Sequence, residues 1–508
     1  MTLWPVTARK ILEIELKLLM EPAELERTSR SRVVSNARIG RGRSALLHTV
    51  YYDTPDGLLW SNGVALRLRR AGNRWMQTLK GAGEEIGGLH QRVEIEWPVV
   101  ADTLDFDVLL DTPFAKLFRR PKVRNSLSPV FETEFRRRSI DVDLPGGTRA
   151  LLCLDSGEIR AGGTTEAISE VEVELVRGET SALLDFAGDL LGERVFRMGM
   201  WSKAERGHAL VSSAGNPAPV RAGRIDLEGI SNSGEAFSRI VRSAAVQVHG
   251  NVDGFLEHAD PEYLHQLRVG LRRLRVALSL PRDESWESAS RSLRDRIRLL
   301  SRTLGEARNW DVFAGEVLKP MATHCDAKML AGLRSRTGLR RSAALASARA
   351  ALVGRETTQI WLDLARLLTG PRPGLNGSAR QFAAASLNLR YRRLFKAAEN
   401  IDSPEAMHRL RICAKKLRYL SEFFAGLYPR HKVKRFISSL GALQEELGAV
   451  NDAATCRKLV AQADAGAKPL GAEARGVALG WIAAGGALAE VRARGAIKAP
   501  MDADPYWK

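Results

Sequence analysis

The sequence predicts an α+β chain of two domains: an N-terminal closed antiparallel β-barrel with flanking helices, then an all-α helical bundle with an internal duplication. Three observations support this prediction. Charged and apolar residues alternate in six short stretches before residue 180. After about residue 233, helical periodicity rich in Ala, Leu and Arg replaces this alternation. Two motifs of this second part recur at a spacing of 143 residues.

The first alternating stretch is Glu13-Ile14-Glu15-Leu16-Lys17, which is typical of a strand with one charged and one apolar face. A single strand of this kind commonly turns its charged face to water. Repetition of the pattern instead favours a closed barrel with a charged interior and an apolar outer face that packs against helices. The pattern returns at residues 64–69, 92–96, 136–138, 141–143 and 170–175.

A barrel interior that holds both carboxylates and Lys/Arg side chains suits a polyanion that carries a divalent metal ion. Carboxylates bind the hard cation, and the basic groups hold phosphate oxygens. Surface charge is the alternative for each of these residues.

Six motifs in this part resemble the CYTH domain of the triphosphate tunnel metalloenzyme family. The short motif Glu13-x-Glu15-x-Lys17 is weak alone, because alternation often produces it. Six matches in family order across residues 11–208 are a specific signal. The other five are Tyr51-Tyr-Asp-Thr-Pro55, Leu66-Arg67-Leu-Arg69, Gly88-Leu-His-Gln-Arg92, Glu170-x-Glu-x-Glu174 and Ser202-Lys203-Ala-Glu-Arg206-Gly.

The resemblance implies a set of site residues. The expected ligands of Mg²⁺ or Mn²⁺ are Glu13, Glu15, Glu172, Glu174 and Asp155. The expected catalytic residues are Glu13, Glu15, Lys17, Glu172, Glu174 and Lys203. The residues expected to bind substrate are Arg67, Arg69, Lys80, Arg92, Arg138 and Arg206.

Two points stay open at this level. Glu170 shares a strand face with Glu172 and Glu174 and could replace either. Residues 136–138 are all arginine, so alternation allows either both ends or only Arg137 to face inward.

Proline and small residues place the domain boundaries. The barrel is expected at 1–210, a linker at 211–232, the helical domain at 233–495 with halves at 233–369 and 375–495, and a tail at 496–508. Within the barrel, residues 38–43 are expected to form a basic loop and residues 102–120 to be helical.

The helical part repeats a basic stripe. Its side chains lie at positions i, i+3, i+7 and i+10, on one face of a helix. A second motif, which begins at Leu304-Gly305, recurs at Leu447-Gly448 with the same spacing. The two stripes are His265, Arg268, Arg272 and Arg275, and then His408, Arg411, Lys415 and Arg418.

Residues 233–490 resemble the CHAD domain, the conserved-histidine α-helical domain. The resemblance implies a helical bundle that binds inorganic polyphosphate through the two stripes. In the second half Asp452 occupies the position where the family is expected to have Asp, whereas Asn309 occupies the equivalent position in the first half. The first half therefore departs from the family pattern at this position.

The charge of the chain is unevenly distributed. Residues 1–220 are neutral overall, so the whole formal charge of +18 lies in residues 221–508. This asymmetry predicts a polyanionic partner. Nucleic acid is not expected, because the basic stripes contain few aromatic residues for base stacking.

Several other features point to a cytoplasmic setting. No signal-peptide core and no run of about 18 apolar residues is present. The cysteines lack both a paired framework and zinc-ligand spacing, which suggests free thiols in a reducing compartment; they are Cys153, Cys325, Cys413 and Cys456.

Together, the two resemblances imply metal-dependent hydrolysis of tripolyphosphate to pyrophosphate and phosphate, with polyphosphate bound by the helical domain. We expect the cytoplasm or polyphosphate granules as the location. Two alternatives remain: a barrel that acts on an organic triphosphate such as thiamine triphosphate or a nucleotide, and a polyphosphate-binding or granule-targeting protein without catalysis.

Overall fold

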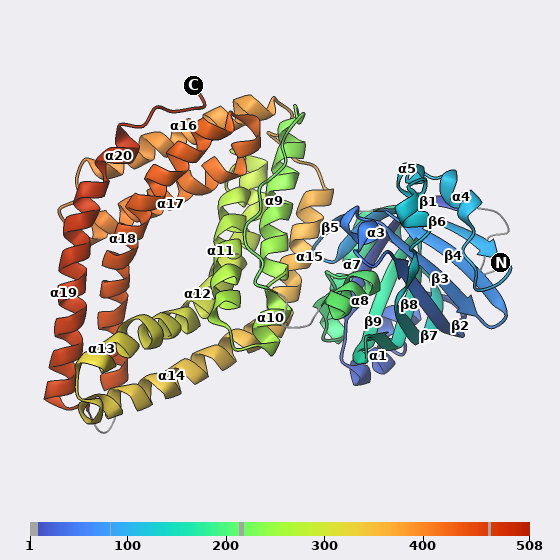
Figure 1. Cartoon of the computed structure of the whole chain (residues 1–508), viewed down its shortest axis with the longest axis horizontal. Coiled ribbons are helices and arrows are strands. Elements are labelled where there is room, and N and C mark those ends of the chain that lie inside the picture. Colours follow the sequence, from blue (N-terminus) through green and yellow to red (C-terminus); the bar gives the residue numbers. More distant parts are fainter. Residues whose placement is uncertain (1–8, 82, 213–217, 466–468) are drawn as a thin grey trace. The chain divides into compact units, whose positions relative to one another are not determined.

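The computed structural model describes residues 9–81, 83–212, 218–465 and 469–508 (Figure 1). The chain packs into two compact units. The first contains residues 1–218 and 353–371, and the second contains residues 219–352 and 372–508. Residues 213–217 of the predicted linker lie outside the described residues.

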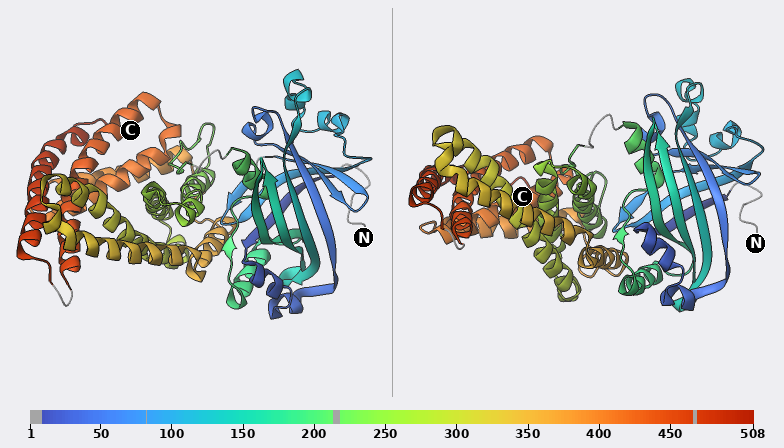
Figure 2. Two further views of the ribbon diagram at one scale, coloured as in Figure 1. Left: turned by 60° about the horizontal axis from the view of Figure 1, so that its bottom comes forward. Right: turned by 90° about the horizontal axis from the view of Figure 1, so that it is seen from below.

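The first unit is built around a closed antiparallel barrel, as predicted (Figure 2). Strand β1 pairs with β9 on one side and with β6 on the other, which closes the sheet on itself. Two short strands, β10 (Arg197–Met198) and β5 (Glu84–Ile86), extend it at one end. The order around the barrel is β1 (Arg9–Leu19), β9 (Thr164–Arg177), β8 (Thr148–Ala161), β7 (Ser128–Leu144), β2 (Arg38–Asp53), β3 (Ala65–Ala71), β4 (Arg74–Lys80) and β6 (Leu89–Val99).

Short helices cover the apolar outer face of the barrel. Leu66, Leu79 and Ile95 point outward from neighbouring strands and pack against Leu109 and Phe118 of the covering helices. Each fully buried side chain of this kind contributes about 1.5–3 kcal/mol. The helices that surround the barrel are α1 (Pro22–Thr28), α2 (Arg32–Ala37), α3 (Leu58–Ser61), α4 (Phe106–Leu110), α5 (Ala115–Phe118), α6 (Pro121–Arg124), α7 (Thr180–Glu193) and α8 (Lys203–Ser212).

One local expectation was wrong, and another holds only in part. Residues 38–43 belong to β2 and not to a loop. The pairing of β2 with β7 shifts register between Ile39 and Arg43, where Gly40 has φ 66°, so an irregularity accommodates the glycine within the strand. The helical expectation for residues 102–120 holds only at α4 and α5, because Asp111 ends the first helix and Pro113 follows.

A helix from far along the chain completes the first unit. Helix α15 (Arg355–Thr369) lies between helices of the second unit in sequence but packs with the barrel elements α7, β10 and β5 (Figure 1). From the sequence, these residues were expected inside the first helical half, 233–369.

The second unit is all-α, as predicted. The first motif of the repeat lies in α11 and α17, and the second lies in α12 and α18. Its helices are α9 (Ser233–His249), α10 (Val252–Glu257), α11 (Pro261–Leu278), α12 (Glu284–Val312), α13 (Lys319–His324), α14 (Ala327–Val353), α16 (Ala379–Ala398), α17 (Pro404–Phe423), α18 (Arg430–Asp464), α19 (Ala472–Ala496) and α20 (Lys498–Met501). Among the described residues, no helix is both long and apolar enough to cross a bilayer.

The last residues of the second unit carry an aromatic anchor. Trp507 is buried, and its ring lies 5.5 Å from that of Tyr391 on α16 and 5.1 Å from that of Phe436 on α18. Its indole N–H donates to Asn388 Oδ1 at 2.9 Å. The segment predicted as a tail therefore joins α16 to α18.

We expect Trp507→Ala to destabilise the second unit by about 3 kcal/mol, because it removes a buried aromatic side chain and leaves a cavity. Thermal or urea unfolding of the full chain, followed by circular dichroism, measures this loss. Trp481→Ala on α19 is the control, since its side chain is 38% exposed. Equal losses for both variants would contradict the anchor.

Candidate active site and basic groove

The barrel encloses a cavity of about 770 Å³. Every strand of the closed barrel contributes to its wall, and the N-terminus of α8 adds Lys203. Because side chains alternate along a strand, the inward faces bring the charged residues of the sequence motifs together. The charged residues of the wall are Glu13, Glu15, Lys17, Arg43, Arg67, Arg69, Lys80, Arg92, Glu94, Glu96, Arg137, Glu172, Glu174 and Lys203.

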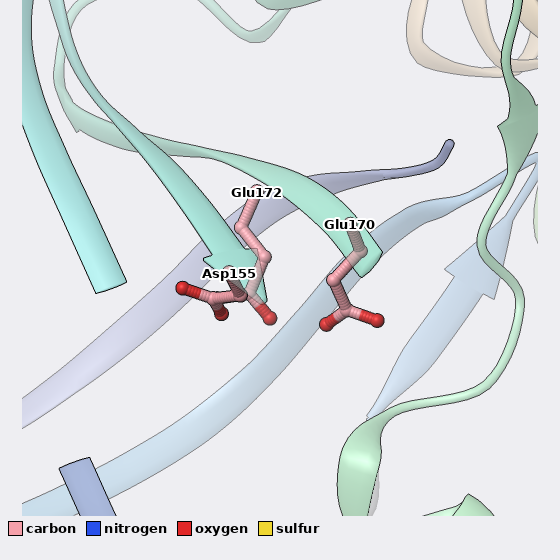
Figure 3. Close-up of side chains that lie close together, drawn as sticks. All are labelled: Asp155, Glu170 and Glu172. Atoms are coloured by element: carbon pink, nitrogen blue, oxygen red, sulfur yellow. The ribbon is translucent and has the colours of Figure 1, made fainter. Parts of the chain in front are cut away.

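Three buried carboxylates gather at the α8 end of the cavity (Figure 3). Asp155 on β8 and Glu170 and Glu172 on β9 each offer an oxygen, and these oxygens lie within 4.8 Å of one another. Lys203 Nζ donates to all three, at 2.7 Å to Asp155 and 3.1 Å to Glu172. The group thus presents hard oxygen donors around one small volume.

Such a donor set fits a hard divalent cation. Lys17 and Arg137 also donate to Glu172. Burial alone would raise the pKa of Glu172, but Lys17 and Lys203 hold this pKa well below its usual range. The carboxylate is therefore ionised at neutral pH and available to a cation.

A second set of carboxylates lies further along the cavity. Lys80 Nζ donates to both oxygens of Glu13, at 2.8 and 2.9 Å. Arg92 joins Glu13 to Glu15, with contacts of 2.9 and 2.6 Å. These bridges fix two carboxylates of the first motif beside two cations.

Glu174 differs from its neighbours. Burial, together with the nearby carboxylates of Glu13, Glu94 and Glu15, raises its pKa from the usual 4.5 to about 8. Glu174 therefore retains its proton at neutral pH in the protein without metal.

Arg67, Arg69 and Arg137 lie on the cavity wall and differ in their partners, because Arg67 and Arg137 each pair with two carboxylates. Arg67 contacts Glu94 at 3.3 Å, and Arg137 contacts Asp155 at 2.7 Å. Arg69 donates to Thr49 at 3.2 Å and forms no ion pair among the described residues. Burial, Arg67 and Arg137 lower the pKa of Arg69 to about 10. This part of the wall therefore favours an anion.

The structure brings most of the predicted barrel residues to this cavity. Asp155 joins the wall through its contacts with Lys203 and Arg137. The predicted residues on the cavity wall itself are Glu13, Glu15, Lys17, Arg67, Arg69, Lys80, Arg92, Glu172, Glu174 and Lys203.

Arg138 is placed elsewhere, which corrects the expectation for this residue. Its Nη1 donates to Ser29 at 3.1 Å outside the cavity, and Arg137 takes the inward position. The reason is the pairing of β7 with β8, which sets Arg137 opposite Asp155. Three consecutive arginines gave no alternation from which to choose the inward one.

Arg206 lies beside the cavity and not on its wall. It donates to Glu170 Oε2 at 3.0 Å and to Glu166 at 2.5 Å. It is one helical turn after Lys203 in α8, so the two residues hold Glu170 from two sides. Its predicted direct contact with substrate is not supported by this placement.

Several inward residues, including Arg43 of β2, were not among the predicted site residues. Glu94 and Glu96 share the strand face of Arg92, so the alternation already contained their signal. Tyr51, within the second motif, and Arg137 also line the cavity.

The second unit contains a basic groove of about 230 Å³. It collects His265, Arg268 and Arg272 from α11 and Arg411 and Lys415 from α17, so the two repeated stripes meet. Its remaining charged or polar residues are Arg308, Asn309, Glu316, Asn451, Asp452 and Thr455.

Crowding of positive charge lowers the pKa of basic residues in the groove. Burial, Arg272 and Arg308 lower the pKa of Arg268 to about 10. Burial, Arg272 and Arg411 lower the pKa of Lys415 to about 6. The groove is thus short of negative charge.

Three predicted residues of the stripes do not line this groove. His408 binds Asn451 Oδ1 at 2.9 Å at its edge. Arg418 pairs with Glu422 at 2.9 Å, and Arg275 lies near Arg298 and Asp295. Arg275 and Arg418 are the last residues of their stripes, and His408 is the first residue of the second stripe.

Family comparisons agree with both domains. A family model for the CYTH domain matches residues 12–207, and one for the CHAD domain matches residues 239–461. The chain is therefore a two-domain protein of a CYTH domain followed by a CHAD domain.

The barrel is similar to an inorganic triphosphatase of Haemophilus influenzae. The two are 32% identical over 205 residues, which is 39% of this chain and 55% of that protein. The chain thus spans about half the length of this curated relative.

Solved structures resemble the helical part. The CHAD domain from the plant Ricinus communis is 32% identical, with a TM-score of 0.51, over 57% of this chain and 98% of that one. PptA from Streptomyces chartreusis is 17% identical, with a TM-score of 0.42, over 54% of this chain and 99% of that one. The second likeness is too low to carry an argument.

We expect Glu174→Gln to stabilise the metal-free protein at high pH. The raised pKa means that the unfolded chain releases this proton from about pH 4.5 and the folded chain only near pH 8. The destabilising contribution of Glu174 to the free energy of unfolding is therefore absent below pH 4.5, grows as pH rises and is complete above pH 8.

Unfolding in EDTA should show a gain of about 1–2 kcal/mol for Glu174→Gln at pH 8.5 and little gain at pH 5. Glu26→Gln on α1 is the control, because the Glu26 side chain is 77% exposed. A gain that does not vary with pH would contradict the raised pKa.

Proposed function

We propose that the barrel hydrolyses inorganic triphosphate to pyrophosphate and phosphate with the help of Mg²⁺ or Mn²⁺. The observation that carries this proposal is the arrangement of Arg67, Arg69 and Arg137 around one cavity that also holds a buried carboxylate group. A triphosphate chain with bound metal complements this charge pattern, because its phosphates suit the arginines and its metal ion suits the carboxylates. The relative named inorganic triphosphatase supports the same substrate.

The residues of the chain have distinct parts in this reaction. Asp155, Glu170 and Glu172 would hold one metal ion, and Glu13 and Glu15 lie where they could contact a second. When bound, the metal polarises phosphate oxygens and lowers the pKa of a coordinated water.

The basic side chains position the phosphates and neutralise charge on the transferred phosphoryl group. Arg69 forms no ion pair in the part of the chain that the structure describes, and it meets the substrate directly. Lys17 and Lys203 would turn toward phosphate oxygens, because their carboxylate partners would hold the metal ion. Catalysis is then mostly positioning and electrostatic stabilisation, with no covalent intermediate.

The helical unit would bind inorganic polyphosphate in the basic groove. Two stripes that meet over a volume of about 230 Å³ with few acidic residues favour a linear polyanion. We place the protein in the cytoplasm, free or on polyphosphate granules.

Phosphate release from tripolyphosphate by the full chain tests the barrel. We expect release with Mg²⁺ or Mn²⁺ and none with EDTA. Faster turnover of ATP or thiamine triphosphate would assign an organic substrate. Absence of all turnover, with polyphosphate binding intact, would make the protein a binding or targeting protein.

Arg69→Met should lower kcat/KM for tripolyphosphate about 100-fold, because it removes one charged contact without leaving a carboxylate unpaired. Arg70→Met is the matched control. Arg70 is the next residue of β3, is exposed and donates to Gly72 O at 2.9 Å. Equal losses for the two variants would argue against the cavity as the substrate site.

Affinity for long-chain polyphosphate should fall at least threefold from pH 6 to pH 8 at fixed salt. Because the pKa of Lys415 is about 6 in the free groove, the bound polyanion must raise it, and binding then takes up a proton. Titration calorimetry in two buffers measures both effects.

Lys415→Gln should weaken binding at pH 6 and flatten the pH dependence. Lys432→Gln on α18, an exposed lysine, should keep the slope of the wild type. A slope in Lys415→Gln equal to that of the wild type would reject this role.

A further inference from the structure

Strand β1 pairs continuously with β9 through Lys17 on one side, but on its other side the pairing changes partner at Lys17. Strand β1 pairs with β6 up to Leu16 and with β10 from Leu18. Between them, Lys17 N–H donates to Gly88 O at 3.0 Å, and Lys17 C=O accepts from Gly199 N–H at 2.8 Å. Two connecting segments therefore fix the backbone of a residue whose side chain reaches the carboxylates of the cavity.

These two segments are fixed to each other. His90 Nε2 bonds Gly199 O at 2.9 Å. Burial and Lys17 lower the pKa of His90 to about 4, so the ring is neutral and Nε2–H is the donor. A Cβ on Gly88 would lie 2.9 Å from Met198 Cε.

Helix α15 packs on both segments. Thr358 Oγ1 donates to Phe196 O at 2.7 Å, directly before β10. The turn at Gly87, with φ 61°, lies so close to the helix that a Cβ there would be 2.5 Å from Trp361 O. At its other end, Arg366 Nη2 donates to Leu184 O of α7 at 2.9 Å.

We propose that α15 is a positioning element of the triphosphatase site: it holds the Gly87–Gly88 turn and β10 against β1 and thereby fixes Lys17. This rests on the proposed function of the barrel. The reaction in the barrel then depends on residues that lie about 150 positions beyond its last strand, between helices of the polyphosphate-binding unit. Lys17 is the residue that touches substrate, and Thr358 and Gly87 act through it.

Gly87→Ala in the full chain separates α15 from the turn. Gly72→Ala is the matched control, because Gly72 has a similar φ of 58° but has no atom within 4 Å of an added Cβ. Both variants carry the same backbone strain. We expect at least a tenfold lower kcat for Gly87→Ala than for Gly72→Ala, with a smaller change in KM.

Two further comparisons separate positioning from general damage. Thr358→Val should lower kcat, and Thr358→Ser, which keeps the hydroxyl, should restore it. In a Lys17→Met background, Gly87→Ala should cause no further loss of kcat. An additive loss, or equal behaviour of Gly87→Ala and Gly72→Ala, would overturn the proposal.

Binding of tripolyphosphate with Mg²⁺, measured by calorimetry, is a second readout. If wild type binds but does not hydrolyse, the proposed function fails, and weaker binding by Gly87→Ala than by Gly72→Ala still supports the positioning role. Equal binding by these two variants would reject it independently of turnover.

Discussion

Ionised side chains in a barrel interior are costly unless each has partners, and this constraint organises the first unit. Acid and base alternate in space because paired strands set Lys17 opposite Glu172 and Arg137 opposite Asp155. The pairing also preorganises the cavity. Phosphate oxygens would replace the carboxylates as partners of the cations, and a metal ion would replace the cations as partner of the carboxylates. Among the described residues of the wall, Arg69 forms no ion pair with a carboxylate, and it gives the cavity its preference for anions.

The two anion sites solve the same electrostatic problem differently. The barrel balances its charges internally and admits a ligand that carries both signs, phosphate and metal. The groove of the helical unit has an excess of cations, and it lowers that excess by weakening the charge of Lys415. A bound polyanion would restore the charge. The net charge of the chain likewise lies in its second part.

The closed barrel and most of its inward residues were predictable, because a period of two along each strand assigns every side chain to a face. The pattern failed at residues 136–138, where three arginines carry no alternation and only pairing with β8 selects Arg137. The pattern also could not choose among Glu170, Glu172 and Glu174. These three residues share one strand face, and only their neighbours in the structure distinguish their roles. Helix α15 was recognisable as a helix, but its amphipathic face does not say which unit it covers.

The place of α15 also has a consequence for how the chain is made. A ribosome releases the barrel strands long before it releases residues 355–369. During that time the first unit lacks helix α15. Phe196 O and the Gly87 turn then lack their partners, and the apolar surface beneath α15 stays in water. The unit that starts earliest is completed only after all of α14 has been synthesised. Assembly of the first unit is thus tied to synthesis of the second unit. Evolution therefore cannot exchange either unit as one independent segment of sequence.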